Sequence, residues 1–174
     1  MKWSLTKKFV LTAVIVFTAV TSVGTFAFFT LDKMHSNFAD LVVRETNEYQ
    51  LVSELNTQLL YFGFATRGVG MAPKKEQAEP FIKEAAEYEK ALTAAVTSLK
   101  TVLTGPKLEA LNKFETDWKA WYPKMTSAFE KAQKDEKEPS LAAIIDGTKD
   151  FVALQKSVAD LLKLVGTSVA EAQQ

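Results

Sequence analysis

The chain has 174 residues, with 21 Lys and Arg against 21 Asp and Glu, one His and no Cys. This length suits one domain, or one domain plus an anchor. The even charge excludes a generally basic nucleic-acid binder and an acidic disordered chain, and the lack of Cys excludes a disulfide framework and a thiolate metal site.

The first predicted element is an uncharged segment over residues 9–31, FVLTAVIVFTAVTSVGTFAFFTL. As a helix it extends about 34 Å, enough to cross a hydrocarbon core of about 30 Å. Residues 1–8 carry three lysines and no acid, which predicts a cytoplasmic N-terminus and an exported remainder. The alternative is a cleaved signal peptide. Its apolar run should be only roughly 7–15 residues long, and Thr25-Phe26-Ala27 is a poor cleavage site, so we predict a single-pass anchor.

A long helix is predicted over about 32–72, continuous with the membrane span. Apolar residues recur along it in steps of three and four, and Pro73 ends it because the residue before a proline resists helical geometry. The heptad spacing reaches down to Met34, which predicts a homodimer formed through this helix. The repeat positions are Leu31, Met34, Phe38, Leu41, Glu45, Glu48, Val52, Leu55, Leu59, Phe62, Thr66 and Val69.

Three further amphipathic helices are expected at about 75–103, 107–132 and 141–172. Pro123 predicts a kink in the third helix near Lys119. Residues 133–139 read as a solvated turn, and Ser140 is a plausible N-cap of the fourth helix. The apolar repeat of that fourth helix is expected at Ile144, Thr148, Phe151, Gln155, Val158, Leu162, Val165 and Val169.

No segment shows the sustained period-two alternation of a strand. The predicted fold is therefore all-α, an antiparallel up-down four-helix bundle continuous with the N-terminal transmembrane helix. The domain plan is a cytoplasmic N-terminus over 1–8, a membrane span over 9–31 and a helical bundle over 32–174. The bundle carries 18 basic and 21 acidic residues, since three of the 21 basic residues precede the span.

Catalysis and metal binding find little support in the sequence. His35 is the single His and has no second His or Cys to share a metal with. Gly68-Val69-Gly70 lacks the third glycine and the preceding strand of a phosphate-binding fingerprint. We expect no catalytic residue, no metal and no cofactor. The aromatic residues Phe62, Trp118, Trp121 and Phe151 are interpreted as core, although Trp118 and Tyr122 lining an apolar pocket is an alternative that spacing cannot exclude.

The segment 63–70, GFATRGVG, stands out within the first exported helix. Arg44 and Arg67 are the only arginines of the chain, and three glycines within eight residues cost a helix about 1 kcal/mol each relative to Ala. Such glycines are tolerated where a backbone must approach another chain or a ligand, and the planar fork of Arg67 suits a carboxylate. The other interpretation is a loosened helix end with a solvated Arg67.

The layout resembles the sensor module of methyl-accepting chemotaxis receptors of the four-helix-bundle type. The resemblance rests on the Lys-flanked span in MKWSLTKKFVLTAVIVF, the unbroken helix leaving it at LDKMHSNFADLVV, the distal turn after FATRGVGMAP and the small-residue ending LLKLVGTSVAEAQQ. It covers essentially the whole chain. In that family such an ending precedes a second membrane span, a HAMP linker and a signalling hairpin, none of which follows here, so we expect a receptor fragment or a natural truncation.

The resemblance also implies a ligand site. In these receptors, arginines of helix one and a Thr of helix four hold anionic ligands near the distal tip, across a dimer interface. By helical rise, Arg67 lies about 8 Å and Thr148 about 10 Å below that tip. We therefore expect Arg67 and Thr148 to contribute to a site for a small anionic ligand, without transferring an amino-acid specificity, because the family's other arginines are absent.

The function expected from the sequence is the extracytoplasmic sensory module of a chemotaxis-type receptor. It would be a bacterial inner-membrane protein with one span, a cytoplasmic N-terminus and a periplasmic bundle, forming a homodimer and binding no nucleic acid. The alternative is a membrane-tethered helical bundle that acts as a protein-interaction or scaffold module without a small ligand. An enzyme is a distant third interpretation.

Overall fold

The structure, a computed structural model, describes residues 5–172, but not the side chains of 5–20, 23, 24, 32, 36, 171 and 172. Within that range the chain forms helices and no strand, which confirms the all-α prediction. The helices are α1 (Leu5–Met71), α2 (Lys75–Val102), α3 (Gly105–Gln133), α4 (Lys137–Asp146) and α5 (Thr148–Ala172).

The chain divides into two compact units, Met1–Val43 and Arg44–Gln174, and α1 contributes to both. In the part of the chain that the structure describes, no helix combines the length and the apolar character needed to cross a membrane. More than half of the predicted span over 9–31 falls on residues whose side chains lie outside that description.

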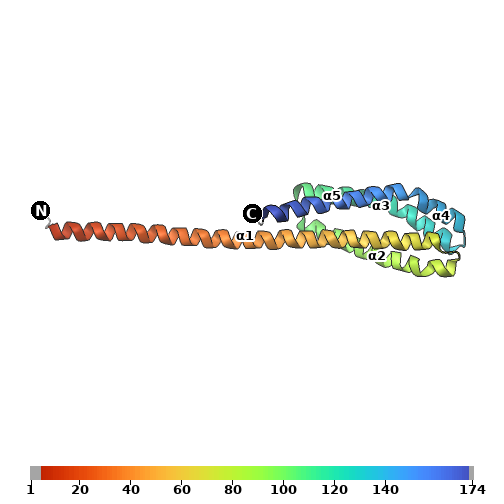
Figure 1. The fold of residues 1–174 in the computed structure, drawn as a ribbon, viewed down its shortest axis with the longest axis horizontal. Helices are drawn as coiled ribbons and strands as arrows, with labels where there is room; N and C mark the ends of the chain where they lie inside the picture. The colour runs from red at the N-terminus through yellow and green to blue at the C-terminus, as the bar shows by residue number, and fades with distance from the viewer. Residues whose placement is uncertain (1–4, 173–174) are drawn as a thin grey trace. The chain divides into compact units, whose positions relative to one another are not determined.

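In the Arg44–Gln174 unit, α2, α3 and the pair α4–α5 pack with the C-terminal part of α1 (Figure 1). The repeat positions predicted for α1 form its buried side in this unit, from Glu45 to Val69. The core is completed by buried apolar residues of α2 and α3, including Leu92, Leu99 and Phe114. Burial of these stripes is what holds the helices together, because a helix stripe gains stability only by packing against another element.

Buried charge lies on the same side of α1. Glu45 and Glu48 are 6% and 3% exposed. Both accept hydrogen bonds from the Lys107 ammonium in the first turns of α3, and the Glu48 bond measures 2.7 Å. The sequence predicted these two positions as members of the stripe, and the lysine on α3 explains how carboxylates can occupy it.

The segment predicted as one helix over 141–172 consists of α4 and α5, separated by a turn at Gly147. α4 already begins at Lys137, so Ser140 lies inside α4 rather than at its N-cap. The Ser140 side chain is buried and its hydroxyl has no hydrogen-bond partner. The acidic turn is correspondingly short, because residues 134–136 alone separate α3 from α4.

The buried side of α5 differs from the predicted one at alternate positions. Leu154 and Leu161 are fully buried, in place of the predicted Gln155 and Leu162. Thr148, also predicted to lie in the stripe, is exposed. The buried positions Ile144, Gly147, Phe151, Leu154 and Val158 keep steps of three and four across the turn at Gly147, so one stripe continues from α4 into α5.

Candidate functional site

A small cavity lies near the distal end of the bundle, between α1, α3, α4 and α5. Its volume is about 30 Å³. Arg67 and Thr148, the two residues predicted from the sequence, both line it. The other lining residues are Gly63, Thr66, Trp121, Met125, Ile144, Gly147 and Phe151.

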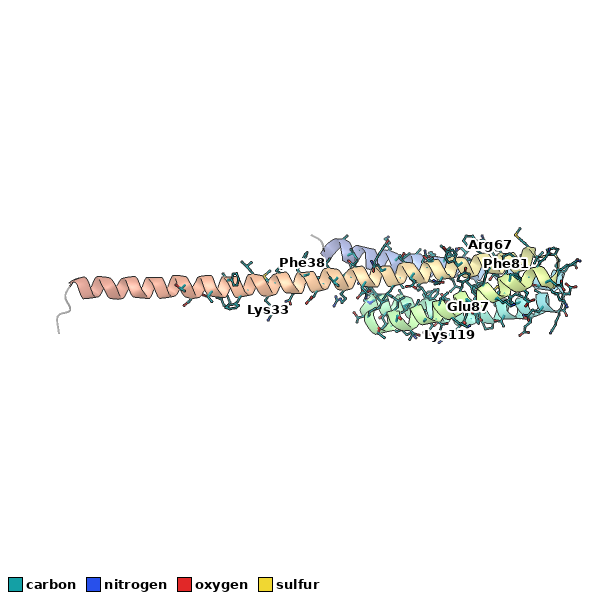
Figure 2. The ribbon with its side chains drawn as sticks, turned by 90° about the horizontal axis from the view of Figure 1, so that it is seen from below. Lys33, Phe38, Arg67, Phe81, Glu87 and Lys119 are labelled. Atoms are coloured by element: carbon teal, nitrogen blue, oxygen red, sulfur yellow. The ribbon has the colours of Figure 1, made fainter. Side chains whose placement is uncertain are left out.

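The two predicted residues present polar groups at the edge of this cavity. The Arg67 side chain is exposed, as Figure 2 shows, and its guanidinium carbon lies 6.0 Å from the centre of the Phe64 ring. The Thr148 hydroxyl donates a hydrogen bond of 3.2 Å to the carbonyl of Ile144, one turn earlier in the chain. Its two oxygen lone pairs remain available as acceptors.

Thr66 supplies a polar group inside the cavity. The residue is 4% exposed, and its hydroxyl has no hydrogen-bond partner. A buried hydroxyl without a partner costs about 1–3 kcal/mol, so such a group usually marks a place where a water or ligand atom completes the bonding. A cavity of about 30 Å³ has room for a water molecule or for one small polar group of a ligand.

Two glycines bring the walls of the cavity together. A Cβ atom on Gly63 would lie 2.3 Å from Cζ of Phe151, and one on Gly147 would lie 2.4 Å from Cε of Met125. The indole N–H of Trp121 donates a hydrogen bond of 2.8 Å to the carbonyl of Gly147, which joins α3 to the break between α4 and α5. The glycine at 63 therefore serves a close helix–helix contact, one of the two interpretations of segment 63–70.

We expect Gly63→Ala to lower the free energy of unfolding by about 1–2 kcal/mol, because the overpacking cost exceeds the helix propensity that alanine adds. Gly166→Ala is the matched control, since its Cβ would meet only Tyr49, at 3.7 Å. The control should be neutral or stabilising by up to about 1 kcal/mol. Chemical denaturation followed by circular dichroism measures both values. Equal effects of the two substitutions would contradict the close contact at Gly63.

An ion pair joins α3 to the first turn of α5, close to Thr148 in the sequence. Lys124 Nζ lies 2.6 Å from a carboxylate oxygen of Asp150. This hydrogen bond, and the charge of Asp150, raise the pKa of the Lys124 ammonium. Both side chains are about half exposed, so the pair positions α5 more than it stabilises the bundle.

A second and larger cavity lies between α2 and α3. Its volume is about 320 Å³, within the range of small-molecule sites. Trp118 and Tyr122 line it, so the pocket that spacing could not establish does exist. Trp118 is at the same time buried in the core, at 6% exposed, which agrees with its predicted structural role.

Sequence reasoning did not single out Thr66 or Gly147 as site residues. Thr66 carried a signal, because it is the polar member of an otherwise apolar stretch of the stripe. Gly147 carried none that separated it from other glycines, since its role depends on Trp121 and Met125 of another helix. Among the residues described by the structure, no group of three or more His, Asp or Glu side chains could hold a metal ion.

Comparison with known proteins assigns the chain to a protein family. A family model described as a four-helix-bundle sensory module for signal transduction matches residues 2–174. No curated protein and no solved structure matches the chain.

Proposed function

Because the chain belongs to the family of four-helix-bundle sensory modules for signal transduction, we propose that it is the extracytoplasmic sensory part of a chemotaxis-type transmembrane receptor. Its role is to bind a small anionic ligand and to convert binding into a small displacement of α5 relative to α1. Such a displacement requires a ligand that binds one arrangement of the helices better than the other.

The proposed topology is a single membrane span over 9–31 with the bundle outside a bacterial inner membrane. Three lysines before the span support a cytoplasmic N-terminus. Large apolar side chains that the structure describes at the end of the span are exposed, with Phe26, Phe28 and Phe29 between 66% and 74%. The hydroxyls of Thr25 and Thr30 donate to carbonyls four residues earlier, which satisfies them without water, as a lipid environment requires.

The proposed assembly is a parallel homodimer through α1. In the Met1–Val43 unit, Leu31, Met34, Phe38 and Leu41 recur in steps of three and four and are exposed by 36% or more. This is the pattern of a helix that buries its stripe against a second helix. A second copy of α1 is the occupant that the proposal assigns to it.

The ligand site is proposed at the cavity lined by Thr66, Arg67 and Thr148. The observation that carries it is the buried hydroxyl of Thr66, without a partner, in the same cavity as a guanidinium and a second hydroxyl. A carboxylate can accept from the Thr66 hydroxyl and from the planar fork of the arginine. The Thr148 hydroxyl, whose hydrogen is donated to the Ile144 carbonyl, can accept from an N–H or O–H group of the ligand. The cavity of one chain admits only part of a ligand, which is consistent with a site completed by the second copy.

The test is ligand-dependent thermal unfolding of the full chain in detergent micelles. Amino and organic acids such as aspartate, succinate and citrate are the probes. We expect at least one of them to raise the melting temperature of the wild type, because a ligand that binds only the folded state stabilises it. Arg67→Ala should abolish the shift, and Lys149→Ala, beside Thr148 but outside the cavity, should retain it.

Two results would contradict parts of this proposal. A shift that survives Arg67→Ala unchanged would remove Arg67 from the site. No shift with any small acid would favour the alternative of a tethered scaffold bundle.

A further inference from the structure

The cavity between α2 and α3 has the size and the walls of a second ligand site, separate from the one lined by Arg67 and Thr148. Its volume of about 320 Å³ is roughly ten times that of the distal cavity, which measures about 30 Å³. Eleven residues line it, six from α2 and five from α3, and they belong to the Arg44–Gln174 unit. Sites that bury a small molecule combine an apolar wall with a few polar groups that orient it.

The wall of this cavity is apolar and aromatic. Leu92 is 0% exposed, and Val96 and Trp118 are each 6% exposed. The rings of Trp118 and Tyr122 stack with their centres 5.2 Å apart and their planes 21° from parallel. Flat apolar surface of this kind favours a flat ring, because aromatic pairs gain energy beyond the area they bury.

One end of the cavity carries the positive charge. Lys100 of α2 and Lys119 of α3 lie 2.5 Å and 2.9 Å from the two carboxylate oxygens of Glu115. Two ammonium groups share one carboxylate, so one positive charge is left uncompensated at this end. Each ammonium has three N–H donors, of which the carboxylate engages one in these contacts, so donors remain for an anion. Figure 2 shows Lys119 at the surface of α3, where a small molecule can reach it.

The opposite end of the cavity carries a negative charge. Glu89 lines it, and its carboxylate accepts a hydrogen bond of 3.0 Å from the Thr93 hydroxyl. By helical rise Glu89 lies about 16 Å along α2 from Lys100. A ligand with a single ring is too short to contact both ends. Its anionic group belongs at the end with Lys100 and Lys119, away from the carboxylate of Glu89.

Pro123 adds an acceptor to the wall. Proline has no backbone N–H, so the carbonyl of Lys119, four residues earlier, lacks its usual helical donor. Pro123 and Lys119 both line the cavity. A ring that carries an N–H or O–H group could bond to this carbonyl.

We propose that the cavity between α2 and α3 binds a small aromatic carboxylate, with the ring against Trp118 and Tyr122 and the carboxylate at Lys100 and Lys119. The site lies within one chain and needs no second copy. It does not depend on the proposed ligand at Arg67, so either site can fail in experiment while the other stands.

The experiment is calorimetric titration of the full chain in detergent micelles with benzoate and with indole-3-acetate, and empty micelles serve as the blank. We expect at least one of the two acids to bind with a Kd below about 1 mM. Lys100→Gln or Lys119→Gln should weaken binding about tenfold, because each removes a charged hydrogen bond. Lys113→Gln is the matched control, since Lys113 pairs with Asp117 on α3 and does not line the cavity.

A second pair of variants tests the cavity independently of charge. Thr97→Trp places a large side chain at an exposed position that lines the cavity, whereas Ser98→Trp places it at the adjacent exposed position that does not. We expect the first to weaken binding at least tenfold and the second to leave it unchanged. Arg67→Ala should also leave it unchanged, which separates this site from the distal one.

Three results would overturn the proposal. The first is heat no larger than that of empty micelles for both acids. The second is equal affinity in the Thr97→Trp variant. The third is binding of benzamide or of phenethylamine as tight as that of the acids, which would show that the lysine end does not select a carboxylate.

Discussion

Lys107→Met should lower the free energy of unfolding by about 3 kcal/mol at pH 7. The substitution keeps an unbranched side chain, one atom shorter, but leaves the buried carboxylates of Glu45 and Glu48 without their ammonium partner. Breaking a buried ion pair by removing one member costs about 3–5 kcal/mol. The lower end applies because Arg44, which is 61% exposed, stays within 3.1 Å of Glu45. Denaturant unfolding of the full chain in micelles measures the difference.

The pH dependence gives this prediction a second readout. Burial raises the pKa of Glu45, but hydrogen bonds from Lys107 and Arg44 outweigh it and the pKa lies below its ordinary value. Burial lowers the pKa of Lys107, but its bonds to the two glutamates raise it above its ordinary value. The stabilisation from Glu45 is thus present above about pH 4.3 and is lost as pH falls through the lowered pKa. The stabilisation from Lys107 is complete below about pH 10.4 and is lost as pH rises through the raised pKa.

The variant should behave in the opposite way on the acid side. Without Lys107, only Arg44 still opposes the effect of burial on Glu45, so the pKa of Glu45 rises and protonation relieves the buried charge. The stability deficit of Lys107→Met should therefore shrink between pH 7 and about pH 4.3. Lys113→Met, at an exposed ion pair on α3, is the control and should change stability by less than about 0.5 kcal/mol. A deficit below about 1 kcal/mol, or one that does not vary with pH, would contradict the structural role given to this cluster.

Phe62→Ala should lower the free energy of unfolding by about 3–5 kcal/mol, the usual cost of a large cavity in a core. Phe62 is 0% exposed, and its ring centre lies 5.0 Å from Trp118 and 5.6 Å from Trp121. The same ring contacts Tyr122 and Phe129, so its removal loosens α3 against α1. We expect the melting temperature to fall by about 10 °C.

Phe64→Ala is the matched control, two residues away on the same helix. Its side chain is 59% exposed, so the loss should stay within about 0.5 kcal/mol. A comparable loss in both variants would show that α1 does not present Phe62 to the core as the structure has it. Calorimetric unfolding of the two variants side by side decides this.

The bundle helices were largely predictable because their apolar periodicity is strong and their ends carry proline or glycine. The stripe of α1 was even predictable through Glu45, Glu48 and Thr66, where polarity argued against burial. A three-four pattern predicts which positions face inward, but it cannot tell what neutralises a buried carboxylate. That information lies on another helix, at Lys107.

The prediction was weakest in the segment 141–172, where it missed the break at Gly147 and reversed the order of the three- and four-residue steps. Gly147 ends α4 and occupies the buried position expected for Thr148, and Leu154 occupies the one expected for Gln155. A glycine within a helical pattern is often tolerated, so the sequence did not require a break there. The contact that explains it, the Trp121 indole with the Gly147 carbonyl, joins residues 26 positions apart.

The two cavities also differ in how far the sequence could predict them. Arg67 and Thr148 could be matched by height in the bundle, because helical rise converts residue number into distance from the tip. The cavity between α2 and α3 depends on the register of two antiparallel helices and on how far Trp118 and Tyr122 leave their wall unfilled. Spacing along one helix carries no information on either point.

The central claim is that the bundle senses a small anion at the cavity shared by α1 and α5, and calorimetric titration of the full chain with amino and organic acids tests it most directly. We predict saturable binding of at least one acid to the wild type and to Lys149→Ala, and no detectable binding to Arg67→Ala. Binding of equal affinity in all three proteins, or no binding of any acid to the wild type, would contradict the claim.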